Sequence, residues 1–193
     1  MKNATKRLVE TAILIALATV LSILKIDMPM GGGLTVCSML PIVLLSFRWK
    51  WKWGVLSAFV YSLLQLVLGL DNVGYAAAGG IGMMIGCILL DYVVAYLVIG
   101  FAGIFDGPEK DHRSAMLAGI VVTFVLRFLC HFITGVWIWN ALWPNEYGMA
   151  AVPYSAAYNG WYMGAELIIT LIVAIIIYTP LKKYITGADL KKA

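Results

Sequence analysis

Long apolar runs dominate this chain, and several of them are long enough to cross a lipid bilayer. A transmembrane helix needs about 20 predominantly apolar residues. Hydrophobic residues make up 62% of the sequence and charged residues only 12%, which is roughly half the charged share of a soluble domain. The sequence therefore predicts a single all-α membrane domain over residues 1–193, with six transmembrane helices at 5–25, 34–47, 53–70, 79–104, 114–140 and 160–184.

Two details qualify this prediction. The second segment is short and contains Pro41, so it is expected to be tilted or buried among its neighbours. The three cysteines lie in apolar segments without metal-ligand spacing, which favours small core side chains and no metal site.

The basic residues predict the orientation in the membrane. Lys25, Asp27, Asp71 and Glu146 fall on one predicted side, whereas twelve of the 14 basic residues fall on the other. The positive-inside rule then places both termini in the cytoplasm. The net charge of +4 reports this topology and not a nucleic-acid partner. The twelve residues are Lys2, Lys6, Arg7, Arg48, Lys50, Lys52, Lys110, Arg113, Lys182, Lys183, Lys191 and Lys192.

Ionisable side chains inside the predicted spans need an explanation, because each is costly there unless it is paired or faces a cavity. Glu10 lies near the cytoplasmic end of the first span, where an interfacial ion pair with Lys6 or Arg7 is expected. The deeper residues are Asp91, Arg127, His131 and Glu166.

Asp91 lies in the middle of the fourth predicted span, beside Tyr92, and requires a partner. Two interpretations remain open at this point. Asp91 forms an ion pair with Arg127, or its carboxylate accepts a hydrogen bond from a bound ligand. For Glu166, pairing with Arg127 is the simplest account.

One face of the fifth predicted span carries a stripe of functional side chains. Arg127 and His131 are one helical turn apart, and Gly135 and Trp139 continue the stripe to the outer mouth. His131 either contacts a ligand or is a satisfied core histidine. Trp137, two residues from Trp139, is expected on a different face.

The outer segments 26–33, 71–78 and 141–159 contain Gly, Asn, Tyr and Trp and could form a lid. Asn159, at the predicted start of the last helix, either caps that helix or contacts a ligand. Aromatic rings combined with a carboxylate and an amide indicate a pocket near the outer leaflet for a flat, polar, cationic molecule. No nucleophile, metalloprotease or Walker A motif is present. We therefore expect no catalytic residue, and any energy from ATP must come from a partner.

Three segments resemble the thiamine-specific substrate-binding subunit, or S component, of energy-coupling factor vitamin transporters. They are LLDYVVA at 89–95, HFITGVWIW at 131–139 and PYSAAYNG at 153–160. Their order and spacing fit this family over almost the entire chain. The resemblance implies ligand roles for Asp91, where the family usually has glutamate, and for Tyr92, His131, Trp139, Tyr154, Asn159, Tyr75 and Trp143.

The resemblance also implies partners. Ala12 and Ala16 of the first helix are similar to the small-residue motif by which S components pack on the transmembrane coupling subunit. Two cytoplasmic ATPases would use the ATP, so this chain would hold no cofactor of its own. The expected location is the prokaryotic plasma membrane, as a multi-pass protein in the lipid bilayer.

Three alternatives remain open. The ligand is a thiamine precursor such as hydroxymethylpyrimidine, or another heterocyclic vitamin. The chain is a stand-alone proton-coupled transporter that uses Asp91 or Glu166, although the sequence shows no inverted repeat, which argues against this. The chain is a small intramembrane enzyme, for which no metal or nucleophile constellation is found.

Overall fold

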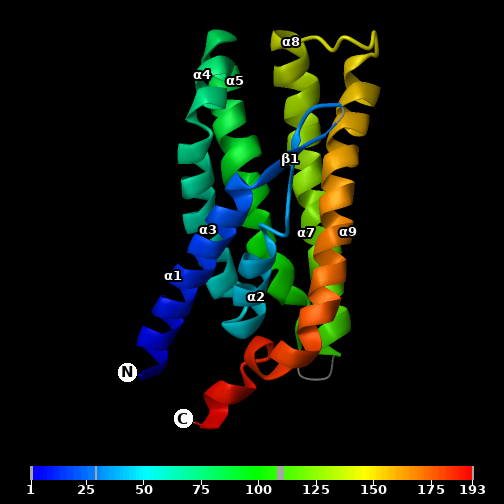
Figure 1. The fold of residues 1–193 in the computed structure, drawn as a ribbon. Helices are drawn as coiled ribbons and strands as arrows, with labels where there is room; N and C mark the ends of the chain where they lie inside the picture. The colour runs from blue at the N-terminus through cyan, green and yellow to red at the C-terminus, as the bar shows by residue number, and fades with distance from the viewer. Residues whose placement is uncertain (1, 29, 108–110, 193) are drawn as a thin grey trace.

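The computed structural model describes residues 2–28, 30–107 and 111–192, so Lys110, counted above for the orientation, lies outside the described residues. The long helices form an elongated bundle in which both termini lie at the same end (Figure 1). The principal helices are α1 (Lys2–Ile23), α2 (Leu40–Arg48), α3 (Trp51–Leu68), α4 (Leu70–Ala78), α7 (His112–Thr134) and α9 (Ala151–Ile185).

Two stretches of the bundle depart from regular α-helix. Between α4 and α7, the chain forms α5 (Ile81–Gly86), the π-helical η1 (Cys87–Val94), the short α6 (Ala95–Leu97) and the 3₁₀-helical η2 (Val98–Phe105). After α7, it forms the π-helical η3 (Gly135–Trp139) and α8 (Asn140–Leu142). Wide π turns within helices frequently accompany functional sites, and these two contain Asp91 and Trp139.

Among the described residues, four helical stretches are long and apolar enough to cross a membrane: Trp51–Leu68, Ile81–Phe105, His112–Leu142 and Ala151–Leu190. They match four of the six predicted spans. The prediction of a helix over 34–47 is wrong in its first part, because the helix begins only at Leu40. At 1.5 Å per residue, nine residues rise only about 14 Å, whereas the bilayer core is about 30 Å thick.

The core is built around α2, as its short length and Pro41 predicted. All nine of its residues are buried, and Pro41 lies in the first helical turn, where its missing N–H costs no hydrogen bond. Side chains of α1, α3, η2, α7 and α9 pack around it. The three cysteines are buried and free of disulfides.

A β-hairpin, which the sequence did not predict, follows α1. Strand β1 (Lys25–Asp27) pairs antiparallel with β2 (Gly33–Thr35), with Ile26 opposite Leu34. Gly32 has a φ of +80°, which favours glycine, and a Cβ there would lie 2.9 Å from the ring of Tyr162. Figure 1 shows the hairpin extending from the end of α1 towards α9.

The other two predicted outer segments are largely helical. Residues 71–78 belong to α4, and α9 begins at Ala151, nine residues before the predicted start of the last span. Asn159 therefore lies inside α9, whose N-cap is Ala150. The helix-capping interpretation of Asn159 is wrong.

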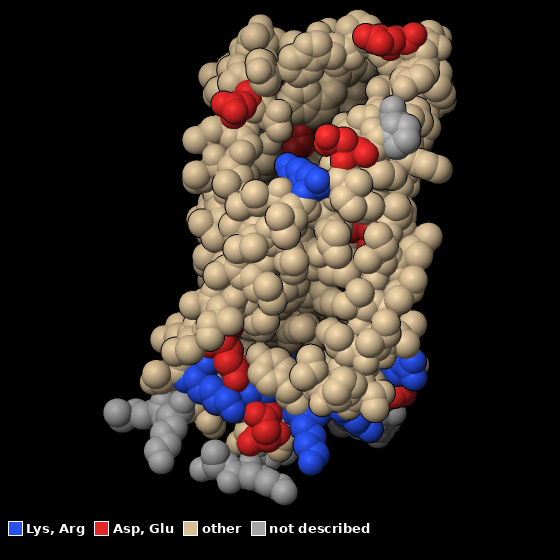
Figure 2. All heavy atoms as spheres, viewed as in Figure 1, with Lys and Arg blue, Asp and Glu red and all other residues tan. Residues whose placement is uncertain are grey.

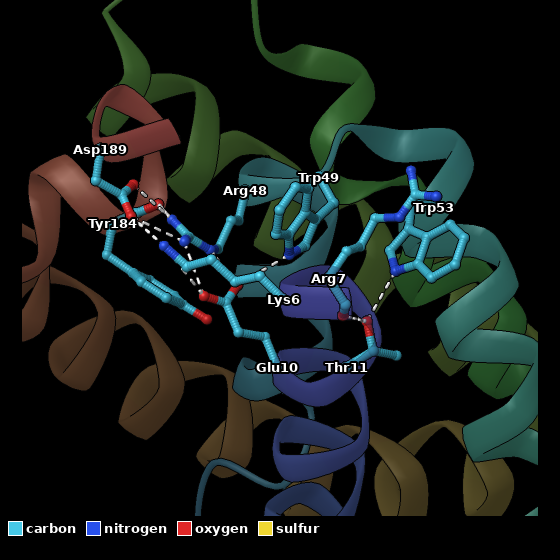
Figure 3. A network of polar contacts seen from close by, with 9 residues as sticks. All are labelled: Lys6, Arg7, Glu10, Thr11, Arg48, Trp49, Trp53, Tyr184 and Asp189. Atoms are coloured by element: carbon cyan, nitrogen blue, oxygen red, sulfur yellow. Dashed lines mark hydrogen bonds and ion pairs between the residues drawn. The ribbon is translucent and has the colours of Figure 1, made fainter. Parts of the chain in front are cut away.

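At the end where the termini lie, basic side chains gather on the surface (Figure 2). Beneath this surface, Arg48 at the end of α2 is wholly buried, with a side-chain exposure of 0%. It donates hydrogen bonds to Glu10 of α1, to the carbonyl oxygen of Tyr184 at 2.7 Å and to Asp189 at 2.8 Å (Figure 3). Asp189 belongs to the 3₁₀ segment η4 (Ala188–Lys192). This arginine cluster therefore ties α1, α2 and the C-terminal segment together.

The ion pair predicted for Glu10 is partly confirmed. Lys6 Nζ lies 3.9 Å from Glu10 Oε1, but Arg48 makes the closer contacts with this carboxylate. The guanidinium of Arg7 instead lies over the ring of Trp53, 3.9 Å from its centroid. No sequence pattern predicted that Arg48, three residues before the start of α3, would be buried inside the protein.

Candidate functional site

A cavity of about 510 Å³ lies between the hairpin, α4, η1, α7 with η3, and α9. Figure 2 shows the molecule hollowed in the half away from the termini. The volume falls within the range of small-molecule sites, roughly 300–1,000 Å³. The cavity brings together seven of the eight residues predicted to bind a ligand: Asp91, Tyr92, His131, Trp139, Trp143, Tyr154 and Asn159.

The eighth residue, Tyr75, is not one of the described lining residues. Its side chain is 54% exposed, and its ring meets that of Trp143 edge-on, with centroids 5.2 Å apart. Tyr75 therefore supports the outer rim of the cavity from outside. Trp137 is 48% exposed and also does not line the cavity, in agreement with its predicted position on another face.

Asp91 is the centre of the site, and it is only 6% exposed. Its Oδ1 accepts hydrogen bonds from His131 Nδ1 at 2.9 Å and from the hydroxyl of Thr134, while its Oδ2 accepts one from the indole of Trp139 at 2.9 Å. The alternative of an Asp91–Arg127 ion pair is therefore wrong. A carboxylate has about four lone-pair positions, so one acceptor position of Asp91 remains.

His131 faces Asp91 with one ring nitrogen and keeps the other without a partner. With Nδ1 hydrogen-bonded to the carboxylate, Nε2 makes no hydrogen bond to any described residue. If Nδ1 carries the proton of a neutral ring, Nε2 is an acceptor. Thr134, one turn further on, is a site residue that the sequence analysis missed, although its spacing from His131 places it on the same helical face.

Aromatic rings form the outer walls of the cavity. Trp139 and Trp143 stack with centroids 5.7 Å apart and planes 13° from parallel. On α9, Tyr154 lies 5.9 Å from Tyr158, a lining residue absent from the predicted set. Such flat, polarisable walls suit a planar ring, and ring faces attract a cation.

Tyr92 and Asn159 line the cavity, but the protein already occupies much of their hydrogen-bonding capacity. The Tyr92 hydroxyl accepts from Asn72 at 2.9 Å and donates to the carbonyl of Gly69 at 3.2 Å. The Asn159 amide donates to the Ser155 carbonyl at 3.0 Å, and its oxygen accepts from Tyr162 at 3.1 Å. These contacts fix α4 and α9 around the site.

Gly135 brings α7 and α9 together behind the cavity. A Cβ at this position would collide with the hydroxyl of Ser155 and lie 3.3 Å from the amide nitrogen of Asn159. Glycine is therefore required for this close approach. The stripe predicted from His131 through Gly135 to Trp139 is confirmed as one wall of the cavity.

Arg127 lines the inner end of the cavity and forms the predicted pair with Glu166, which is not itself one of the described lining residues. Arg127 Nη1 donates to Glu166 Oε2 at 3.2 Å, and both residues are buried. The other carboxylate oxygen accepts from the hydroxyls of Thr35 and Ser38. Neither hydroxyl carried a signal in the sequence, because only the hairpin brings residues 35–38 beside α9.

The electrostatic character of the cavity follows from these contacts. Asp91 contributes a negative charge near the aromatic walls, whereas Arg127 and Glu166 offset each other at the inner end. Within the parts of the chain that the structure describes, no three His, Cys, Asp or Glu residues are arranged to hold a metal ion. The arrangement suits a cationic heterocycle that donates a hydrogen bond.

Comparisons with known proteins identify a family. Residues 8–186 match the family model described as Thiamine transporter protein (Thia_YuaJ). The thiamine transporter ThiT of Bacillus subtilis (strain 168) is 30% identical over 184 residues, which cover 89% of this chain and 90% of that protein. ThiT of Lacticaseibacillus paracasei is 25% identical over 191 residues, covering 94% and 91%.

Two solved structures share the fold. ThiT from Listeria monocytogenes superposes with a TM-score of 0.67 at 23% identity, covering 94% of this chain and 95% of that one. A structure described as the S component of a bacterial ECF transporter gives a TM-score of 0.61 at 19% identity, covering 94% and 98%. The overall helical fold is therefore shared with these two structures.

Proposed function

We propose, from the premise that this chain belongs to the thiamine transporter protein family, that it binds thiamine and serves its uptake as the S component of an energy-coupling factor transporter. Membership in this family makes the chain a transport protein and not an enzyme. The observation that carries the proposed site is the Asp91 carboxylate, held between His131 and Trp139 in a cavity of suitable volume.

The chemistry of thiamine fits this site. Its aminopyrimidine amino group would donate to the free acceptor position of Asp91, a charge-assisted hydrogen bond. Its permanently cationic thiazolium ring, which carries the hydroxyethyl group, would lie between the rings of Trp139 and His131. The His131 ring lines the cavity beside Asp91, and Tyr92, Tyr154 and Asn159 complete the polar surface.

The proposed membrane arrangement has six helices, of which α2 is buried among the others and too short to cross the bilayer by itself, with both termini in the cytoplasm and the cavity opening outwards. Two observations support it. The termini lie at one end of the bundle (Figure 1), and basic side chains gather at that end (Figure 2). Under the positive-inside rule, this end is cytoplasmic.

The proposed partners are a transmembrane coupling subunit and two cytoplasmic ATPases, which would use the ATP, so that this chain needs no cofactor. Ala12 and Ala16 are exposed on α1. In lipid, small residues allow close packing of helices, which supports this face as the docking surface. Reorientation of the loaded subunit would then deliver thiamine.

Ala16→Trp is expected to separate binding from transport. The bulky ring would block close helix approach at α1 without touching Asp91 or His131. Thiamine affinity of the isolated chain should stay near that of the wild type, while uptake in cells that supply the coupling subunit and ATPases should fall about tenfold, as expected for loss of roughly 1.4 kcal/mol of association energy.

Leu17→Trp is the matched control, because Leu17 is also exposed but lies about 100° further around α1. It should retain most of the uptake. Loss of both binding and uptake in Ala16→Trp would show damage to the fold. Full uptake would argue against this docking face.

Thiamine binding itself is tested by tryptophan fluorescence of the purified chain. Thiamine should quench the wild type, and Trp139→Ala should weaken binding by about 2 kcal/mol through loss of ring stacking and cation–π attraction. Trp137→Ala, outside the cavity, should lose much less. If Trp137 proves the more sensitive position, the assignment of the aromatic wall is wrong.

The alternatives are separated by two further measurements. If hydroxymethylpyrimidine displaces thiamine at concentrations as low as those at which thiamine itself binds, the chain transports a precursor. Uptake by the purified chain alone in vesicles with a proton gradient would indicate a secondary transporter. Mass spectrometry of the molecule that co-purifies with the protein identifies the ligand directly.

A further inference from the structure

The inner end of the cavity is built from buried polar groups, in contrast to the aromatic outer walls. Arg127 lines it, with the ring of Tyr96 5.1 Å from the guanidinium carbon. Its Nε has no hydrogen-bond partner among the described residues, although the residue is only 6% exposed. The other lining groups there are the side chains of Ser22, Thr35, Ser38 and Gln65.

These groups suit the uncharged polar end of a ligand. Hydroxyl and amide side chains both donate and accept hydrogen bonds, as a ligand hydroxyl does. The aromatic walls near Trp139 and Trp143 suit the rings of the ligand instead. A ligand anchored on Asp91 would therefore direct its hydroxyl-bearing end towards Arg127, one turn deeper than His131 on α7.

Glu166 determines the charge of this inner end. Arg127 alone would place a buried positive charge there, which attracts phosphate and repels a cationic ring. Glu166 accepts its hydrogen bond at 3.2 Å and makes the pair neutral. Among the described lining residues, the remaining charges are Asp91, near the rings, and Lys25, which is exposed on the hairpin.

We infer that Glu166 selects against phosphorylated ligands by neutralising Arg127, so that the cavity takes the hydroxyethyl end of thiamine and disfavours thiamine monophosphate. This inference rests on the proposed function, because it presupposes that thiamine is the ligand. Thiamine monophosphate carries its phosphate on the hydroxyethyl group that would face Arg127. The charge of the inner end, and not its volume, is the discriminating property.

Four proteins, the wild type and three variants, differ stepwise in the charge of the inner end. It is neutral in the wild type, positive in Glu166→Gln, negative in Arg127→Gln and neutral again in the double variant. Glutamine at 166 keeps an acceptor for the Thr35 and Ser38 hydroxyls, so the hairpin contacts remain. The measured quantity is the ratio of the Kd of thiamine monophosphate to the Kd of thiamine, by titration of each purified protein.

The ratio should fall about tenfold or more in Glu166→Gln, because an unpaired cation then attracts the phosphate and repels the thiazolium in a medium of low effective dielectric. It should rise in Arg127→Gln, where the phosphate meets an unpaired carboxylate. The double variant should stay within about threefold of the wild type, since its net charge is unchanged.

The order of the ratios decides the inference. A ratio that is the same in all four proteins would overturn it and would place the hydroxyethyl end towards the mouth. If either Glu166→Gln or Arg127→Gln fails to fold, the direction in which the Kd ratio changes in the other variant still supports or contradicts the inference. Absence of thiamine binding by the wild type would instead reject the proposed function, so the two failures are distinguishable.

Discussion

Arg48→Met is expected to lower the free energy of unfolding by about 3–5 kcal/mol, the usual cost of breaking a buried ion pair by removing one partner. The guanidinium is fully enclosed and contacts two carboxylates, Glu10 and Asp189. Its removal would leave Lys6 as the remaining close cation, 3.0 Å from Asp189. It would also remove the cation stacked 3.8 Å from the ring centroid of Tyr184.

Lys50→Met provides the matched control. Lys50 also makes an ion pair, with Asp106 at 2.9 Å, but its side chain is 67% exposed, and such a pair contributes about 1 kcal/mol at most. Thermal unfolding of both variants in the same detergent measures the difference. Equal losses would mean that burial of Arg48 adds nothing to the contribution of its ion pairs.

Asp91→Asn is expected to weaken thiamine binding by about 1.5–3 kcal/mol, the range for hydrogen bonds to charged groups, or roughly tenfold to 150-fold in Kd. Asparagine is nearly the same size, but its amide nitrogen donates where the carboxylate accepted. It cannot accept from His131, from Trp139 and from the ligand together. The affinity is measured by titration of a monodisperse sample.

Two comparisons make this result specific. Asp71→Asn, the same change at an exposed residue of α4, should leave binding unchanged. Asp91→Glu keeps the charge and should bind more tightly than Asp91→Asn. If Asp91→Asn retains wild-type affinity, the carboxylate serves only to hold His131 and Trp139 in place.

The sequence predicted the long helices well and the short elements poorly. Apolar length alone identified four membrane-length helices, because each is predominantly apolar over 18 residues or more. It could not separate residues 34–39 from α2, since the apolar run continues through Leu34 and Met39 although the backbone changes there. The hairpin depends on Gly32 packing against Tyr162, a contact 130 residues away in the chain.

Most of the site was predictable, because its residues have few other reasons to lie in a membrane. The pairing of Arg127 with Glu166 and the placement of Asp91 beside a ligand-sized cavity are examples. The choice between partners was not predictable: the sequence left Arg127 open as a partner for Asp91, which instead takes Thr134 and Trp139.

Arg48 illustrates a different limit. Charge counting treated it as one of twelve basic residues on the predicted cytoplasmic side. Its burial depends on Glu10, Tyr184 and Asp189 arriving from both ends of the chain. Such a convergence of distant segments leaves no local pattern around residue 48.

The wide turns that contain Asp91 and Trp139 have a consequence for how this cavity evolves. In a regular α-helix, gaining or losing one residue rotates everything beyond it by about 100°. A π turn already accommodates an extra residue within an α-helix, so deleting one between Gly135 and Trp139 would leave the flanking helix in its present orientation. Only the side chains within the turn would be redirected. Besides residue identity, helix length at these two points is therefore a second property by which the lining of this cavity can change while the fold is kept.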